Sequence, residues 1–251
     1  MPRTRFILIE TSHAGNVGGV ARAMKVMGFD DLVLVRPRWS NVLRREETIQ
    51  RASGALDVLH NARIVESLDE ALEGMTHLCA TAMVARDFGP PTRTPRQHLS
   101  PLAQTAPDGV AFLFGSERFG MSNDDVYRCH VALRIPTDPA FGSLNLASAV
   151  QVIAYEWREA LGGWGETEVP PQGDAVDATA VPARADAKQI SGLLQHWEQS
   201  LTDIGFLDPQ APKKLMPRLQ QLFNRAGLTP EEVHILRGVA RHMTRHPAEK
   251  G

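Results

Sequence analysis

The chain has 251 residues, of which 43% are hydrophobic and 22% are charged, and these proportions are ordinary for a globular protein with one good core and an appendage. Its formal net charge of −2 argues against a uniformly basic coat for nucleic acid, although a local basic face remains open. No apolar run approaches the roughly 18 residues of a membrane span, and the apolar run near the N-terminus is too short for a signal peptide. We therefore expect a soluble, cytoplasmic protein.

Short apolar runs alternate with helix-like stretches through the first 161 residues. The runs are 5–9, 32–35, 62–65, 77–83, 110–115 and 131–136, and the helix-like stretches lie near 16–28, 45–56, 68–74 and 123–129. This alternation predicts an α/β domain over residues 1–161, with a parallel sheet that has helices on both faces. An amphipathic stretch from about 144 to 161 predicts a further helix, packed on the core or at a subunit interface.

Residues 162–188 break this pattern, because they contain four glycines and three prolines, and five acidic residues against two basic ones. We interpret them as a flexible acidic linker. Residues 189–251 carry three amphipathic stripes and predict a small helical extension. The third helix is expected to begin at T-P-E-E, with Thr229 as cap and Glu232 completing a capping box. Arginines recur every four residues at 237, 241 and 245, which indicates either a solvated helix face or a phosphate-binding ridge.

A glycine-rich turn, HAGNVGGVARAMK at 13–25, follows the first apolar run. Such turns often present backbone N–H groups to a phosphate. The glycines at 15, 18 and 19 do not match G-x-G-x-x-G, however, and the second run ends in Arg36-Pro37, where a dinucleotide-binding fold places an acidic residue. Both departures disfavour an NAD-type oxidoreductase.

Two later stretches are ambiguous when taken singly. GSERFGMS at 115–122 has the glycine spacing of a phosphate loop, but Met121 stands in place of the lysine, so ATP hydrolysis is disfavoured. FGSLNLASAVQV at 141–152 places Ser143 and Asn145 at a helix start, where either residue type can cap, and it lacks the G-x-S-x-G of a serine hydrolase. The sequence shows no metal-ligand spacing, so we predict no metal site, and we expect Cys79 and Cys129 to be buried, reduced thiols.

The order of these stretches is informative where each alone is not. Asn16, Gly19 and Arg22 in the glycine-rich turn, then FLFGSERFGMSN, then IPTDPAFGSLNLASAVQVIAYE resemble the three motifs of the SpoU/TrmH-type ribose methyltransferases of the SPOUT superfamily. Within it the chain is most similar to the TrmJ family, also through LFNRAGLTPEEVHILRGVA in the extension. The resemblance implies an α/β domain whose C-terminal part threads into a trefoil knot, a homodimer, and S-adenosylmethionine as methyl donor. It further implies 2′-O-methylation of the cytidine or uridine at position 32 of the tRNA anticodon loop.

The same resemblance assigns roles to individual residues. The donor would be held by Thr81, Ala82, Met83, Gly115, Ile135, Gly142, Ser143 and Leu144. The catalytic residues would be Arg22, Asn16, Ser143 and Asn145, and the RNA-binding residues Arg22, Arg86, Arg118, Arg237 and Arg241. Arg22 is expected to be essential, either as proton acceptor or as electrostatic stabiliser, since an arginine pKa above about 12 opposes the first role. Two alternatives remain: a methyltransferase acting on another tRNA or rRNA nucleotide, and a catalytically silent RNA-binding member.

Three structural expectations accompany these roles. The glycines of the first motif are expected to leave room for the acceptor RNA strand. Asn16 is expected either to cap the helix at 17–28 or to hydrogen-bond Arg22 or the nucleotide. Glu117 is expected to have a structural role at the turn of the second motif, where it either pairs with Arg118 or leaves Arg118 to bind RNA.

Overall fold

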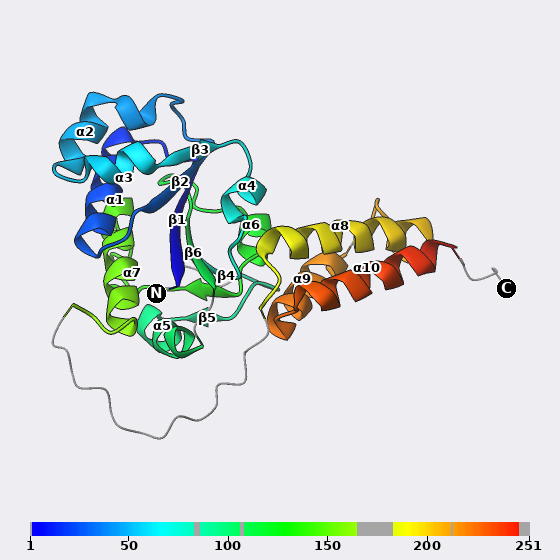
Figure 1. Ribbon diagram of the computed structural model, residues 1–251. Coiled ribbons are helices and arrows are strands. Elements are labelled where there is room, and N and C mark those ends of the chain that lie inside the picture. Colours follow the sequence, from blue (N-terminus) through cyan, green and yellow to red (C-terminus); the bar gives the residue numbers. More distant parts are fainter. Residues whose placement is uncertain (1, 83–85, 106–107, 165–182, 212, 246–251) are drawn as a thin grey trace, which may run out of the picture.

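The computed structural model describes residues 2–82, 86–105, 108–164, 183–211 and 213–245 (Figure 1). Within these residues the chain forms one parallel sheet of seven strands in the order β3-β2-β1-β6-β4-β7-β5. The strands are β1 (Arg3–Ile9), β2 (Asp31–Val35), β3 (Arg63–Val65), β4 (His77–Thr81), β5 (Thr92–Arg93), β6 (Gly109–Phe114) and β7 (Val131–Leu133). Six of them coincide with the predicted apolar runs, and the two-residue β5 is too short to show a pattern. The predicted α/β class is confirmed.

Helices cover both faces of the sheet, as expected from strands that are apolar on both sides. One face carries α1 (Ala14–Val26), α2 (Glu46–Ala52), α3 (Leu56–Asn61), α5 (Pro95–Gln104) and α7 (Leu146–Ala160). The other face carries α4 (Leu68–Leu72) and α6 (Asn123–Tyr127). Alternate residues of β1 divide between the two cores, with Phe6 and Leu8 in the first and Ile7 and Ile9 in the second. The trefoil knot implied by the resemblance stays a prediction.

Two helix predictions need correction. The single helix expected near 45–56 is two helices, because Ser53 ends α2 at a φ of 52°, which an α-helix does not accommodate. Helix α5 was not expected at all, since Pro95 and Pro101 mask its pattern. Its start signal is nevertheless present in the sequence: Thr94 and Gln97 form a capping box, with proline in the first turn.

The helical extension consists of α8 (Ala187–Asp203), α9 (Leu215–Ala226) and α10 (Pro230–Arg245), which share a core around Leu193, Phe223 and Val233. The predicted capping box is confirmed, because Thr229 Oγ1 accepts from the Glu232 amide at 3.2 Å and Glu232 Oε2 accepts from the Thr229 amide at 2.7 Å. Most of the predicted linker, residues 165–182, lies outside the described residues. No helix in the described part of the chain is long and apolar enough to cross a membrane.

The extension packs against the α4 and α6 side of the domain (Figure 1). From α9, the Asn224 side-chain amide donates to the carbonyls of Arg128 and Cys129 at 3.1 and 3.2 Å. At the start of α8, Asp186 accepts from the Gly74 amide at 3.2 Å. These polar contacts to backbone groups fix the position of the extension on the domain.

Candidate functional site

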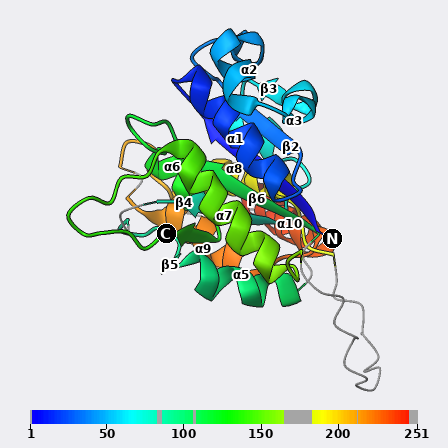
Figure 2. The ribbon, with the colours of Figure 1, turned by 90° about the vertical axis from the view of Figure 1, so that its left-hand side faces the viewer.

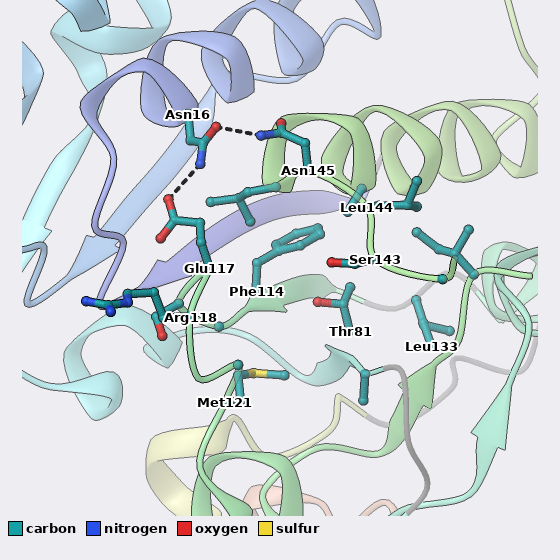
Figure 3. A pocket seen from close by; sticks show the side chains of 18 of the residues that line it. Asn16, Thr81, Phe114, Glu117, Arg118, Met121, Leu133, Ser143, Leu144 and Asn145 are labelled. Atoms are coloured by element: carbon teal, nitrogen blue, oxygen red, sulfur yellow. Dashed lines mark hydrogen bonds between the residues drawn. The ribbon is translucent and has the colours of Figure 1, made fainter. Parts of the chain in front are cut away.

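A pocket of about 640 Å³ lies at the carboxyl edge of the sheet, where β4, β6 and β7 end (Figure 3). In open parallel sheets this edge is the usual place for a ligand. Seven of the eight expected donor residues line the pocket: Thr81, Ala82, Gly115, Ile135, Gly142, Ser143 and Leu144. The eighth, Met83, lies outside the described residues. The pocket has the size of sites for small organic ligands.

The walls of the pocket combine apolar side chains with close backbone. Phe114, Met121, Leu133 and Ile135 supply the apolar surface. Gly115 permits the tight turn of the second motif, because a Cβ there would lie 2.2 Å from the backbone carbon of Gly120. Such walls suit a flat heterocycle with a ribose, since apolar side chains can cover its faces and the glycine turn lets backbone approach it closely.

Arg86 also lines the pocket, but its guanidinium is held at the wall. Its Nε donates to Asn123 Oδ1 at 2.7 Å and its Nη2 to the Met121 carbonyl at 2.9 Å. Arg86 therefore braces the loop of the second motif within this chain, which leaves less of its guanidinium for the expected RNA contact. Arg118, the other expected RNA-binding residue at the pocket, is exposed and lies 5.8 Å from the centroid of the Phe119 ring.

The carboxylate of Glu117 joins the second motif to the loop before α1. It accepts hydrogen bonds from Thr11 Oγ1 at 2.9 Å, from the amide and hydroxyl of Ser12 at 2.8 and 2.9 Å, and from Asn16 Nδ2 at 2.8 Å. Burial alone would raise the pKa of Glu117, but the hydrogen bonds from Asn16 and Ser12 outweigh burial and hold this pKa at about 2. Glu117 is therefore ionised at neutral pH and acts as an acceptor only.

Asn16 links this carboxylate to the third motif (Figure 3). Its Oδ1 accepts from Asn145 Nδ2 at 2.9 Å, while the Asn145 Oδ1 accepts from the Ala147 amide and caps α7. The capping prediction for Asn145 is thus confirmed. For Asn16 it is wrong, because α1 begins two residues earlier at Ala14. The chain Glu117–Asn16–Asn145 fixes both amides at the rim of the pocket.

The glycines of the first motif do not leave room for an RNA strand, so that expectation is wrong. A Cβ at Gly18 would lie 2.1 Å from the carbonyl oxygen of Thr48 in α2, and one at Gly19 would lie 2.9 Å from the Cβ of Ala147 in α7. These residues are glycines because α1 packs closely against two neighbouring helices. The close packing is what brings Asn16 within reach of Asn145.

Arg22 is exposed on α1, and α1 lies next to α7 (Figure 2). It is not among the residues that line the pocket of its own chain. Among the described residues it has no hydrogen-bond or ion-pair partner, so its guanidinium is available to another molecule.

The two arginines expected to bind RNA from α10 differ in their surroundings. The guanidinium of Arg237 lies against α8, where a Cβ at Gly192 would be 2.3 Å from its Nη2, whereas Arg241 is exposed. The ridge predicted from the sequence is therefore only partly a solvated face.

Both cysteines are buried and free, as predicted, and burial raises the pKa of each thiol. One grouping was not foreseen: the ligand atoms of His77, Cys79 and His98 lie within 4.8 Å of one another. His77 Nε2 and His98 Nε2 are 3.0 Å apart, at hydrogen-bond distance. Arg93 and Arg184 line the cavity beside both histidines, and their charge opposes a cation there.

These histidines predict acid sensitivity. Burial, with Arg184 and His98 adding to it, lowers the pKa of His130 to about 4, and burial also lowers the pKa of His77 and His98. Between pH 6.5 and about 4 the unfolded chain binds protons that the native chain does not, so the free energy of unfolding must fall as pH falls. We expect a loss of about 3 kcal/mol between pH 7 and pH 4 from His130.

Chemical denaturation at pH 7, 5.5 and 4 measures this loss. His130→Asn keeps an acceptor for the Leu78 amide, which donates to His130 Nδ1 at 3.1 Å, and is expected to flatten the pH dependence. His60→Gln, on the exposed side of α3, is expected to leave it unchanged. A stability that stays constant down to pH 4 in the unaltered chain would contradict this account.

Comparison with known proteins agrees with the geometry. The model of the SpoU rRNA Methylase family matches residues 3–155, and that of the tRNA methyltransferase TrmJ C-terminal domain matches residues 188–251. The chain is 40% identical to the tRNA (cytidine/uridine/adenosine-2′-O-)-methyltransferase TrmJ of Pseudomonas aeruginosa, over 95% of this chain and 93% of that protein. It is 43% identical to the tRNA (cytidine/uridine-2′-O-)-methyltransferase TrmJ of Salmonella typhimurium, over 94% and 93%. The crystal structure of TrmJ from Z. mobilis ZM4 superposes with a TM-score of 0.78 at 31% identity, covering 97% of this chain and 99% of that one. The chain therefore belongs to the SpoU methylase family, and to the TrmJ group within it.

Proposed function

We propose that the protein transfers a methyl group from S-adenosylmethionine to the ribose 2′-hydroxyl of nucleotide 32, a cytidine or uridine, in the tRNA anticodon loop. The observation that carries the proposal is the hydrogen-bonded chain Glu117–Asn16–Asn145, which holds all three motifs at the rim of one pocket. Relatives named as tRNA 2′-O-methyltransferases align with the chain over almost its whole length.

The pocket fits the donor. Thr81, Gly115, Ile135 and Leu144 bring no charge to its wall, which suits a sulfonium cation, and its volume of about 640 Å³ accommodates a nucleoside with an amino-acid tail. The bound donor supplies an activated methyl group that needs only an oxygen nucleophile in line with the breaking carbon–sulfur bond. The protein accelerates the transfer chiefly by holding the donor and the acceptor ribose in the correct relative position at the rim of the pocket.

On the acceptor side we assign four side chains. Asn16 and Asn145, fixed by their mutual hydrogen bond at 2.9 Å, orient the ribose, together with the hydroxyl of Ser143 in the pocket. Arg22 binds the neighbouring phosphate and stabilises the negative charge that develops on the 2′-oxygen. A guanidinium stays protonated in proteins, so the proton that the 2′-hydroxyl loses passes to solvent rather than to Arg22. Because methyl transfer from a sulfonium needs no Lewis acid, activity is expected to persist in EDTA.

We further propose that the enzyme is a cytoplasmic homodimer. The outer surface of α1 and α7, which pack against each other, includes Arg22 and the apolar side chains of Val26 and Tyr155, which are 56% and 46% accessible. A second copy on this face would cover these side chains and place Arg22 between two pockets. Light scattering of the full chain is expected to give the mass of a dimer, and a monomer mass at assay concentration would contradict the proposal.

In the proposed organisation, residues 1–161 form the catalytic domain and residues 189–251 form a helical extension that adds a tRNA-binding surface. Residues 162–188 are the linker between these two parts. Arg241 is the stronger phosphate contact of the two α10 candidates because Arg237 is turned towards α8. Phosphate contacts of this kind make binding weaken steeply with salt.

The test is methyl transfer by the purified full chain to tRNA that lacks 2′-O-methylation, followed by mapping of the modified nucleotide. The proposal predicts a single 2′-O-methyl group at position 32. Methylation at another tRNA or rRNA nucleotide would contradict the assignment of nucleotide 32 but would still support 2′-O-methyl transfer as the reaction. Binding of RNA without any methyl transfer would identify a catalytically silent member of the family.

A further inference from the structure

The segment that follows β2 carries an aromatic side chain with two guanidinium groups close to its ring. The indole of Trp39 is 38% accessible, and the Cζ atoms of Arg38 and Arg45 lie 4.9 and 4.6 Å from its ring centroid. Neither arginine has a carboxylate partner among the described residues. Arginines that are not neutralised by the chain itself are available to an external anion.

The segment is also strongly basic for this chain. Residues 36–51 contain five arginines and two glutamates, whereas the whole chain has a net charge of −2. Only Arg36 in this stretch is paired among the described residues, with Glu10 at 3.0 Å. A local excess of positive charge with an exposed aromatic ring at its centre complements a polyanion that carries flat rings.

Hydrogen bonds fix this segment to the loop that precedes α1. The Arg38 amide donates to the Thr11 carbonyl at 3.0 Å, and Thr48 Oγ1 donates to the carbonyls of Ala14 and Val42 at 3.0 and 2.7 Å. Thr11 in turn donates its hydroxyl to Glu117 at 2.9 Å. The cluster of Arg38, Trp39 and Arg45 is thus held against the same loop that positions Asn16, at the carboxyl edge of the sheet.

We propose that Arg38, Trp39 and Arg45 form a binding site for single-stranded RNA, in which Trp39 stacks an unpaired base next to the target nucleotide and the two arginines contact its phosphates. This proposal rests on the proposed function and adds to it a site for the anticodon-loop strand. Unstacked loop bases are commonly recognised by aromatic rings and by guanidinium planes. The two guanidinium groups hold the indole in place before RNA arrives, which reduces the entropy lost on binding.

The experiment measures tRNA affinity and steady-state kinetics of the full chain with an unmodified tRNA transcript. Trp39→Ala is expected to raise the Kd for tRNA, and the KM, roughly tenfold. Because Trp39 does not line the donor pocket, kcat at saturating tRNA and the Kd for S-adenosylmethionine are expected to change less than twofold. Trp39→Phe keeps a stacking face and is expected to restore most of the affinity.

Trp164 provides the matched control. It is 69% accessible and also stacks on an arginine, since the Arg158 Cζ lies 4.5 Å from its ring centroid. Arg158 Nε donates to the Met27 carbonyl just after α1, so Trp164 lies at the opposite end of α1 from the pocket. Trp164→Ala is therefore expected to bind tRNA as the unaltered chain does.

The arginines give an independent readout. Arg38→Gln and Arg45→Gln are each expected to reduce the slope of log affinity against log salt by about 0.7, the value for one phosphate contact on a single strand. Equal tRNA affinity of Trp39→Ala and Trp164→Ala, in a chain that methylates tRNA, would overturn this proposal alone. So would a change of oligomeric mass in Trp39→Ala, which would assign the cluster to a protein interface. Absence of methyl transfer by the unaltered chain would instead count against the proposed function.

Discussion

Replacing Arg22 with alanine is expected to lower kcat about 100-fold or more while the Kd for S-adenosylmethionine changes less than twofold. The reason is positional: Arg22 is exposed on α1, outside the donor pocket, and has no partner among the described residues of its own chain. Its charge therefore serves the acceptor side of the reaction. Single-turnover methyl transfer and equilibrium donor binding measure the two quantities separately.

Arg22→Lys serves as the control for charge alone. Lysine keeps a positive charge but lacks the planar fork that contacts a phosphate with two hydrogen bonds, so we expect an intermediate rate. Lys25→Ala, three residues further along α1, removes a cation already paired with Asp57 at 2.7 Å and is expected to have little effect. An Arg22→Ala enzyme with more than a tenth of the normal rate would remove Arg22 from the mechanism.

Replacing Glu117 with glutamine is expected to lower the free energy of unfolding by about 2 kcal/mol and to reduce kcat at least tenfold. A hydrogen bond to a charged group contributes about 1.5–3 kcal/mol, and the carboxylate accepts from Thr11, Ser12 and Asn16. A glutamine amide has only one acceptor oxygen. Its NH₂ group is a donor and would face the N–H or O–H groups that donate to the second oxygen of the carboxylate. Asn16 would lose its fixed orientation, which is why the rate falls together with the stability.

The pH dependence identifies the carboxylate as the cause. The pKa of Glu117 is about 2 in the folded chain, below its ordinary value of 4.5, so its stabilisation is present above pH 4.5 and is lost as pH falls towards 2. Urea unfolding at pH 7 and pH 3 is expected to show a smaller difference for Glu117→Gln than for the unaltered chain. Glu159→Gln, at an exposed position on α7, is the control. A Glu117→Gln chain of full stability and full rate would show that the hydrogen-bond chain is dispensable.

Much of the sheet could be predicted from the sequence because its central strands, β1, β2 and β6, are buried on both faces and read as continuous apolar runs. The residues 5–9, 32–35 and 110–115 were found in this way, and β1, β2 and β6 occupy these positions. The pocket residues were located through their resemblance to motifs rather than through any pattern of their own. Their positions at the ends of β4, β6 and β7 follow from the fold.

The rest could not be predicted, because it depends on contacts between residues far apart in the chain. Glu117 meets Asn16 across 101 positions and Asn145 meets Asn16 across 129 positions, so no local pattern reveals either hydrogen bond. The role of Gly18 was misjudged for the same reason, since its neighbour Thr48 lies in another part of the chain. The start of α5 is the exception, because Thr94, Pro95 and Gln97 lie within four residues of one another and form a local helix-start signal.

The most direct test of the central claim uses a tRNA in which the 2′-hydroxyl of nucleotide 32 alone is replaced by hydrogen. The full chain is incubated with this tRNA and with the unaltered tRNA, and transfer of labelled methyl from S-adenosylmethionine is measured for both. The account predicts transfer to the unaltered tRNA and none to the 2′-deoxy tRNA. Equal labelling of the two would contradict it, because the methyl group would then lie on a base or on another ribose.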